Sequence, residues 1–169
     1  MRRMTITFVI VLGISLLSLA VANACGDKLL RIGRGARFQR SMHPATVLIY
    51  LPSSAPADES TKAPKLQAFL KRAGHKSNIV QGGDRLNQVL GSGQYDVVLA
   101  SLTEVASVQQ QIEASPSRPV VVPMIFNGTK ADVAAAKKHF RSVVKNPNDG
   151  DQYLDAIEEV MRSKMRVKA

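Results

Sequence analysis

The chain has 169 residues and a formal net charge of +10 at pH 7, from 23 Lys and Arg against 13 Asp and Glu. A single cysteine excludes an intrachain disulfide. Tryptophan is absent and aromatic residues make up 5% of the chain, too few for base-stacking platforms that bind nucleic acid. The length suits one domain behind an N-terminal segment.

The first 24 residues have the features of a secretory signal peptide. Arg2 and Arg3 precede an apolar stretch over 6–22, and Ala22-Asn23-Ala24 fits the small-x-small cleavage rule. The alternative is a retained membrane anchor, since the apolar stretch has about the minimum length for crossing a bilayer. We therefore expect an exported protein that is periplasmic or attached to a membrane.

Cleavage after Ala24 would make Cys25 the first residue of the mature chain, where bacterial lipoproteins carry their acyl chains. Ala22 stands where lipoprotein signals prefer a large aliphatic residue, so a free thiol or an intermolecular disulfide is the alternative. Cys25 is thus a candidate site of lipid attachment.

Residues 25–44 form a basic tether with a cation at every third position. In an extended, polyproline-like conformation these cations share one face, which would attract anionic lipid headgroups. The alternative is a solvated tether without a partner, and nucleic acid is a weaker expectation than either. The cations are Lys28, Arg31, Arg34, Arg37 and Arg40.

Residues 45–169 alternate predicted strands with predicted helices. Four apolar residues over 97–100 indicate a strand covered on both faces. Pro123 predicts a bulge or an early loss of strand pairing, and Thr129 with Asp132 predicts a helix capping box. The predicted strands are 45–50, 75–81, 97–100, 120–126 and 140–144. The predicted helices are 62–73, 84–90, 103–112, 129–138 and 153–161.

Such alternation implies a parallel sheet with helices on both faces. Residues 95–100 (Tyr-Asp-Val-Val-Leu-Ala) and 119–122 (Pro-Val-Val-Val) resemble the third strand and the start of the fourth strand in the receiver domain of bacterial response regulators. Residues 145–147 (Lys-Asn-Pro) resemble the lysine–proline step after the fifth strand. Residues 25–40 resemble exported bacterial proteins that carry this domain. The resemblance implies a three-layer α/β sandwich with a five-stranded parallel sheet of flavodoxin-like order 2-1-3-4-5.

The chemistry of receivers does not carry over to this sequence. Receivers hold a divalent cation with an acidic pair after the first strand, and they phosphorylate an aspartate after the third. Tyr50 and Leu51 stand at the first of these positions and Ser101 at the second. Met124 replaces the hydroxyl residue after the fourth strand, and Lys145 alone matches. We therefore expect a pseudo-receiver that is not phosphorylated, without catalytic residues, metal or cofactor.

Three functions remain open on this scaffold. We favour a non-catalytic interaction module whose unknown protein partner meets residues 129–161, the surface that receivers commonly use. The first alternative is a small-molecule or anion-binding domain at the carboxyl edge of the sheet, through Ser101, Thr103 and Lys145. The weakest is a hydrolase using Ser101, because no G-x-S-x-G sequence surrounds this serine.

The three histidines show no pattern typical of a metal site. His43, His75 and His139 are far apart in the sequence, without the short spacings of metal ligands. We expect all three on the surface.

Overall fold

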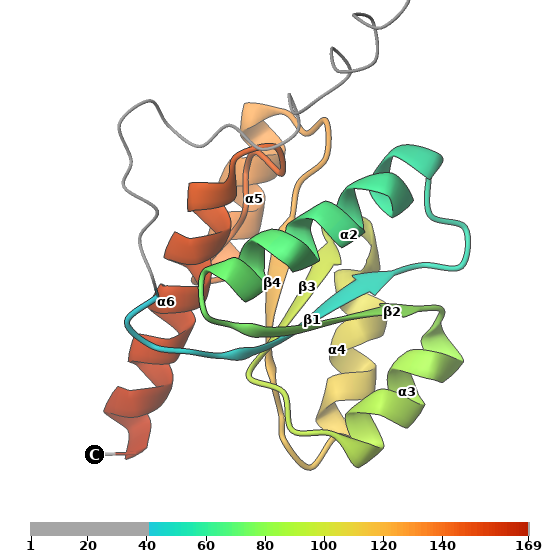
Figure 1. The fold of residues 1–169 in the computed structure, drawn as a ribbon. Coiled ribbons are helices and arrows are strands. Elements are labelled where there is room, and N and C mark those ends of the chain that lie inside the picture. Colours follow the sequence, from blue (N-terminus) through green and yellow to red (C-terminus); the bar gives the residue numbers. More distant parts are fainter. Residues whose placement is uncertain (1–40, 169) are drawn as a thin grey trace, which may run out of the picture.

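The computed structural model describes residues 41–168 and shows an α/β fold built on one parallel sheet (Figure 1). The predicted signal peptide, Cys25 and the five cations of the basic tether lie outside the described residues. No helix within the described part of the chain is long and apolar enough to cross a membrane.

The sheet has four strands in the order β2-β1-β3-β4, all parallel. They are β1 (Thr46–Leu51), β2 (Lys76–Gln81), β3 (Val97–Ser101) and β4 (Val120–Met124). The helices are α2 (Ala57–Arg72), α3 (Gly83–Ser92), α4 (Val105–Glu113), α5 (Lys130–His139) and α6 (Gly150–Lys168), with a short 3₁₀ helix η1 (Leu102–Glu104) before α4.

Helices cover both faces of the sheet, which confirms the predicted three layers (Figure 1). Helices α2 and α6 bury Phe69, Leu70, Tyr153 and Ile157 against one face. Helices α3 and α4 pack on the other face in a second apolar cluster. Because both faces are covered, the central strands must be apolar on both sides.

Strand β3 occupies the centre that its apolar run predicts. Val97, Val98, Leu99 and Ala100 are fully buried, and β3 pairs with β1 on one side and with β4 on the other. This arrangement brings the carboxyl ends of three neighbouring strands to one edge of the sheet.

The prediction of a fifth strand over 140–144 is wrong, because only a single bridge forms there. Val144 pairs with Met124, through hydrogen bonds from Val144 N–H to the Pro123 carbonyl and from Ile125 N–H to the Val144 carbonyl, both 2.9 Å. In a longer ladder the next donor along β4 would be residue 123, but proline has no N–H. The early loss of pairing predicted at Pro123 is therefore confirmed on this side of β4.

Helix α2 begins at Ala57, five residues before the predicted start at residue 62, and continues through Pro64. Asp58 and Glu59 lie in its first turn, where carboxylates interact favourably with the helix dipole. The earlier start places Glu59 at the carboxyl edge of the sheet, a position that the sequence analysis did not assign.

Candidate functional site at the carboxyl edge of the sheet

The structure brings the predicted site residues of β3 and β4 to the same edge. Ser101 is paired with Met124 in the register of these strands, and the bridge from Met124 to Val144 places Lys145 at the next position along that edge. Leu51, at the end of β1, lies level with Ser101, because Ile49 is paired with Leu99 two residues earlier.

The side chains on either side of Ser101 are apolar and buried. Leu51 is 7% exposed and Met124 is 3% exposed, and both belong to the core beneath α2 and α6. Tyr50 belongs to the core on the opposite face. Burial, together with the charge of Glu104, raises the pKa of the Tyr50 phenol. Neither neighbouring strand therefore supplies a carboxylate at its end.

The hydroxyl of Ser101 lies 3.2 Å from the hydroxyl of Thr103. Thr103 is exposed in η1. Its contact with Ser101 shows that these two residues, both predicted to contact a ligand, lie next to each other. A hydroxyl is a weak nucleophile unless a neighbouring base or a metal activates it. This hydrogen bond joins two hydroxyls and supplies no base.

Lys145 is exposed and has a second cation as its close neighbour. The close approach of the Lys137 side chain, and repulsion between the two charges, lower the pKa of Lys145. Its backbone N–H donates to Gln152 Oε1 at 3.0 Å, which fixes the loop before α6. The third predicted ligand contact thus faces α5.

A small apolar cavity lies beside this edge, between α2 and α6. Its volume is about 20 Å³, roughly the space of one water molecule. Its lining includes Leu51, Leu66, Met124, Tyr153 and the carboxylate-bearing Glu59. A cavity of this size cannot hold an organic ligand without opening.

Glu59 is the titratable group that the sequence analysis missed at this edge. Burial and the charges of Asp58 and Glu104 raise the pKa of its carboxyl group, although Lys62 opposes them. Burial and the charge of Glu59 together raise the pKa of Tyr153. The sequence does contain a signal for the earlier start of this helix. Asp58 and Glu59 follow Pro56, and acids favour the first turn of a helix. Within residues 41–168, no group of three His, Cys, Asp or Glu side chains is placed to hold a metal ion.

Asp96 lies at the opposite edge, just before β3. Its carboxylate accepts from the Thr46 backbone N–H at 3.0 Å and lies 3.3 Å from Lys164 Nζ. This carboxylate therefore fastens the amino ends of β1 and β3 to α6, well away from Ser101.

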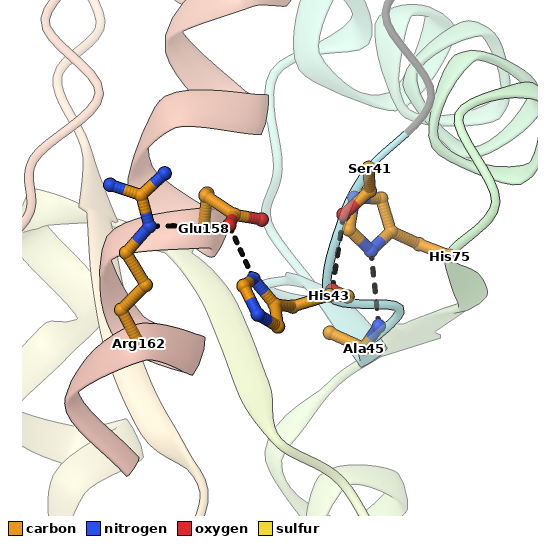
Figure 2. A network of polar contacts seen from close by, with 6 residues as sticks. All are labelled: Ser41, His43, Ala45, His75, Glu158 and Arg162. Atoms are coloured by element: carbon orange, nitrogen blue, oxygen red, sulfur yellow. Dashed lines mark hydrogen bonds and ion pairs between the residues drawn. The ribbon is translucent and has the colours of Figure 1, made fainter. Parts of the chain in front are cut away.

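A second polar network lies at this amino edge (Figure 2). His43 Nδ1 contacts Glu158 on α6, and Arg162 donates to the same carboxylate at 3.3 Å. Burial alone would raise the pKa of Glu158, but His43 and Arg162 hold it below its usual value.

His75 is buried at the same edge, so the prediction of a surface position is wrong for this residue. It is 3% exposed and accepts from the Ala45 backbone N–H at Nδ1, 3.2 Å away. Because Nδ1 is the acceptor, the ring proton of the neutral form sits on Nε2, a buried atom without a hydrogen-bond partner. Burial lowers the pKa of His75, although the charge of Glu158 raises it.

The predicted partner surface, 129–161, contains the least buried α-helix of the described fold. Ala136 is the only buried residue of α5. A shallow polar groove of about 380 Å³ runs along α6 beside Arg141. Within 129–161, α5 is therefore mostly exposed, whereas α6 buries Tyr153, Ile157 and Val160 in the core.

Comparison with known proteins adds only a likeness of fold. No protein-family model matches the chain, and no curated protein matches it in sequence. Among solved structures, the chain is similar to a response regulator protein from Burkholderia pseudomallei, crystallised with a phosphorylated aspartic acid, a calcium ion and citrate. The match has a TM-score of 0.49 and 14% sequence identity, and it covers 73% of each chain. The fold assignment itself is based on the sheet order and layers described above.

Proposed function

We propose that this chain is an exported, non-catalytic interaction module on a receiver-like scaffold that does not take up a phosphoryl group. The observation that carries the proposal is the placement of Ser101 between Leu51 and Met124, two buried apolar side chains at the ends of the neighbouring strands. Phosphoryl transfer to an aspartate needs that aspartate, and its cation needs oxygen ligands. This edge of the sheet presents methyl and methylene groups where those oxygens would stand.

Two further observations support a role without catalysis. The hydroxyl of Ser101 faces another hydroxyl, that of Thr103, rather than a histidine or carboxylate. The adjacent cavity has room for about one water molecule, which disfavours the small-molecule alternative in this conformation. Export, expected from the first 24 residues, would also separate the domain from kinases that use cytoplasmic ATP.

We propose residues 129–161 as the surface that meets a protein partner. Helix α5 exposes most of its length, including Ala134 and Ala135, and Ala136 is the only residue of this helix that is buried. An alanine-rich exposed face lets a partner approach the helix closely. The likeness to receivers, which often use this region, motivates the choice of surface.

The absence of phosphoryl transfer is tested with acetyl phosphate and Mg²⁺, followed by intact-mass spectrometry. We expect no stoichiometric gain of a phosphoryl group, in the chain itself or in a Ser101→Ala variant. A Ser101→Asp variant tests whether the single missing aspartate would be sufficient. We expect it to remain unlabelled, because Leu51 and Met124 still flank the site. Stoichiometric labelling of the unmodified chain would overturn the proposal.

The partner surface is tested by photo-crosslinking in cells that express the full chain. A photoreactive amino acid replaces Ala134 on α5, and the matched control replaces Asn87, exposed on α3. We expect a discrete cross-linked species from position 134 and none from position 87. Equal products from both positions, or none from position 134, would contradict the assignment of this surface.

A further inference from the structure

The segment that leads into the domain is fastened at the amino edge of the sheet. Ser41 donates its backbone N–H to the Ala73 carbonyl at 3.0 Å, at the end of α2. Two residues later His43 contacts Glu158 on α6 (Figure 2). The basic tether of the sequence analysis therefore joins the folded domain at the edge where the strands begin and where α2 ends.

Basic side chains gather around this attachment point. Helix α2 ends with Lys71 and Arg72, and the last turns of α6 carry Arg162, Lys164 and Arg166. Helices α3 and α4 end without any basic residue in their last turns. Helix α5 also has basic residues in its last turn, Lys137, Lys138 and His139. The helix dipole favours cations at every helix C-terminus, so it does not explain why α3 and α4 lack them.

Arg141 extends this basic region beyond α6. Arg141 precedes the single bridge between Val144 and Met124, and its place beside α6 comes from the groove that it lines. It lines the polar groove together with Arg162 and Arg166. Asp155, Glu158 and Glu159 line the same groove.

The acids of this edge are mostly occupied by partners within the fold. Asp96 lies 3.3 Å from Lys164, and Glu158 contacts both His43 and Arg162. Glu159 accepts a hydrogen bond of 2.6 Å from a serine hydroxyl. Five cations of the amino edge have exposed side chains. They are Lys71, Lys76, Arg118, Arg141 and Arg166.

The carboxyl edge differs in having acids where its helices begin. Each helix that begins there has an acid in or just before its first turn, while the amino edge gathers the cations described above. These acids are Asp58, Asp84, Glu104, Asp132 and Asp151. Lys62, Lys130 and Lys145 also lie at the carboxyl edge, so its charge is mixed. The cations of the amino edge lie on the side of the domain where the tether joins it.

We propose that the amino edge is the surface that the folded domain presents to an anionic lipid bilayer, with the carboxyl edge turned away. The inference rests on the export in the proposed function, together with the membrane-attached alternative of the sequence analysis, and adds the orientation of the domain. Lys and Arg side chains near an anionic surface each strengthen binding by about fivefold. Attachment through a basic tether beside a predicted signal or anchor favours a bilayer over other polyanions.

A tryptophan reporter can test this orientation, because the natural chain contains none. The full chain is reconstituted into vesicles of brominated phosphatidylcholine with or without brominated phosphatidylglycerol. Met165→Trp places the reporter on exposed α6 at the amino edge, and Ser54→Trp places it in the exposed loop after β1. We expect lipid quenching of most of the fluorescence at position 165 in the anionic vesicles only, and none at position 54.

Two charge-reversal variants test whether the contact with the bilayer depends on the cations of the amino edge or only on the net charge of the chain. The first changes Lys71, Arg141 and Arg166 to Glu at the amino edge. The control changes three exposed cations elsewhere to Glu, with the same change in net charge. These are Lys65, Arg85 and Lys130. We expect quenching at position 165 to be lost in the first variant and kept in the control.

The outcomes distinguish the inference from the function on which it rests. If the full chain does not co-float with either vesicle, membrane attachment and the inference both fail. If it co-floats but positions 165 and 54 are quenched alike, the orientation alone is wrong. Binding to heparin or DNA without binding to vesicles would assign the basic edge to another polyanion and would also overturn the inference.

Discussion

The imidazole of His43 contacts the carboxylate of Glu158, which lies 115 positions later in the chain. This contact joins the segment before β1 to α6, and both side chains are largely shielded, with 31% and 18% of their surfaces exposed. Arg162 donates to the same carboxylate from the next turn of α6. The network therefore holds the point where the N-terminal segment meets the domain.

Removing one member of this network is expected to destabilise the fold modestly. Glu158→Gln should lower the free energy of unfolding by about 1–2 kcal/mol, because it weakens two charged hydrogen bonds in a partly shielded site. Urea denaturation followed by circular dichroism measures the change. The control is Asp58→Asn, which breaks the Lys62–Asp58 pair, where the aspartate side chain is 69% exposed. We expect less than about 0.5 kcal/mol there, and equal losses would contradict a special role for Glu158.

The burial of His75 predicts that the domain loses stability on mild acidification. Its pKa is lowered in the folded state, so below about pH 6.5 the unfolded chain binds a proton that the folded chain does not. Stability should therefore fall as the pH decreases from about 6.5, by at most about 1.4 kcal/mol per pH unit. Glu158, whose pKa is also lowered, contributes only at more acidic pH.

His75→Asn isolates this effect, because the amide oxygen can accept from the Ala45 N–H but does not titrate in this range. Its stability should be nearly constant between about pH 5 and 6.5. The measurement is the urea midpoint as a function of pH for both proteins. An unchanged pH dependence in the variant would show that other groups are responsible.

Two glycines in the domain are expected to respond oppositely to alanine. A Cβ on Gly150, at the start of α6, would lie 2.7 Å from the buried ring of Phe69, whereas a Cβ on Gly91 in α3 would meet no atom within 4 Å. Gly150→Ala should destabilise the domain by about 1–3 kcal/mol, because a fully buried ring has little room to move. Gly91→Ala should stabilise it by about 0.5–1 kcal/mol through helix propensity. Thermal unfolding compares the two, and a neutral Gly150→Ala would show that Phe69 can shift.

Pro123 is expected to limit the sheet to four strands. Pro123→Val restores an N–H that can donate to the carbonyl of Ser142, two residues before the existing bridge at Val144. We expect slower amide hydrogen exchange at Val144 and at the new residue 123, measured by NMR. Pro123→Gly is the control, since it restores the N–H but adds backbone freedom. Unchanged exchange at Val144 in the valine variant would mean that another feature prevents the fifth strand.

Local patterns in the sequence predict much of the fold. The apolar run 97–100 is the central strand, because a segment without polar residues is stable only when both faces are covered. The capping box of Thr129 and Asp132 forms as predicted, since its hydrogen bonds join residues three positions apart. The alternation of elements similarly indicates parallel strands with helices on both faces. These features depend on neighbours in the sequence, so the sequence contains the information needed to infer them.

Other features depend on contacts between distant segments, and only the tertiary structure reveals them. Glu59 comes close to Tyr153 because α2 and α6 pack on the same face of the sheet. His75 lies buried beside the segment that holds His43, where it accepts a hydrogen bond from the Ala45 N–H. The end of the ladder at Val144 likewise depends on which side of β4 the missing N–H of Pro123 faces. Amino-acid types and spacing determine which elements form, whereas burial and pKa depend on which side chains those elements bring together.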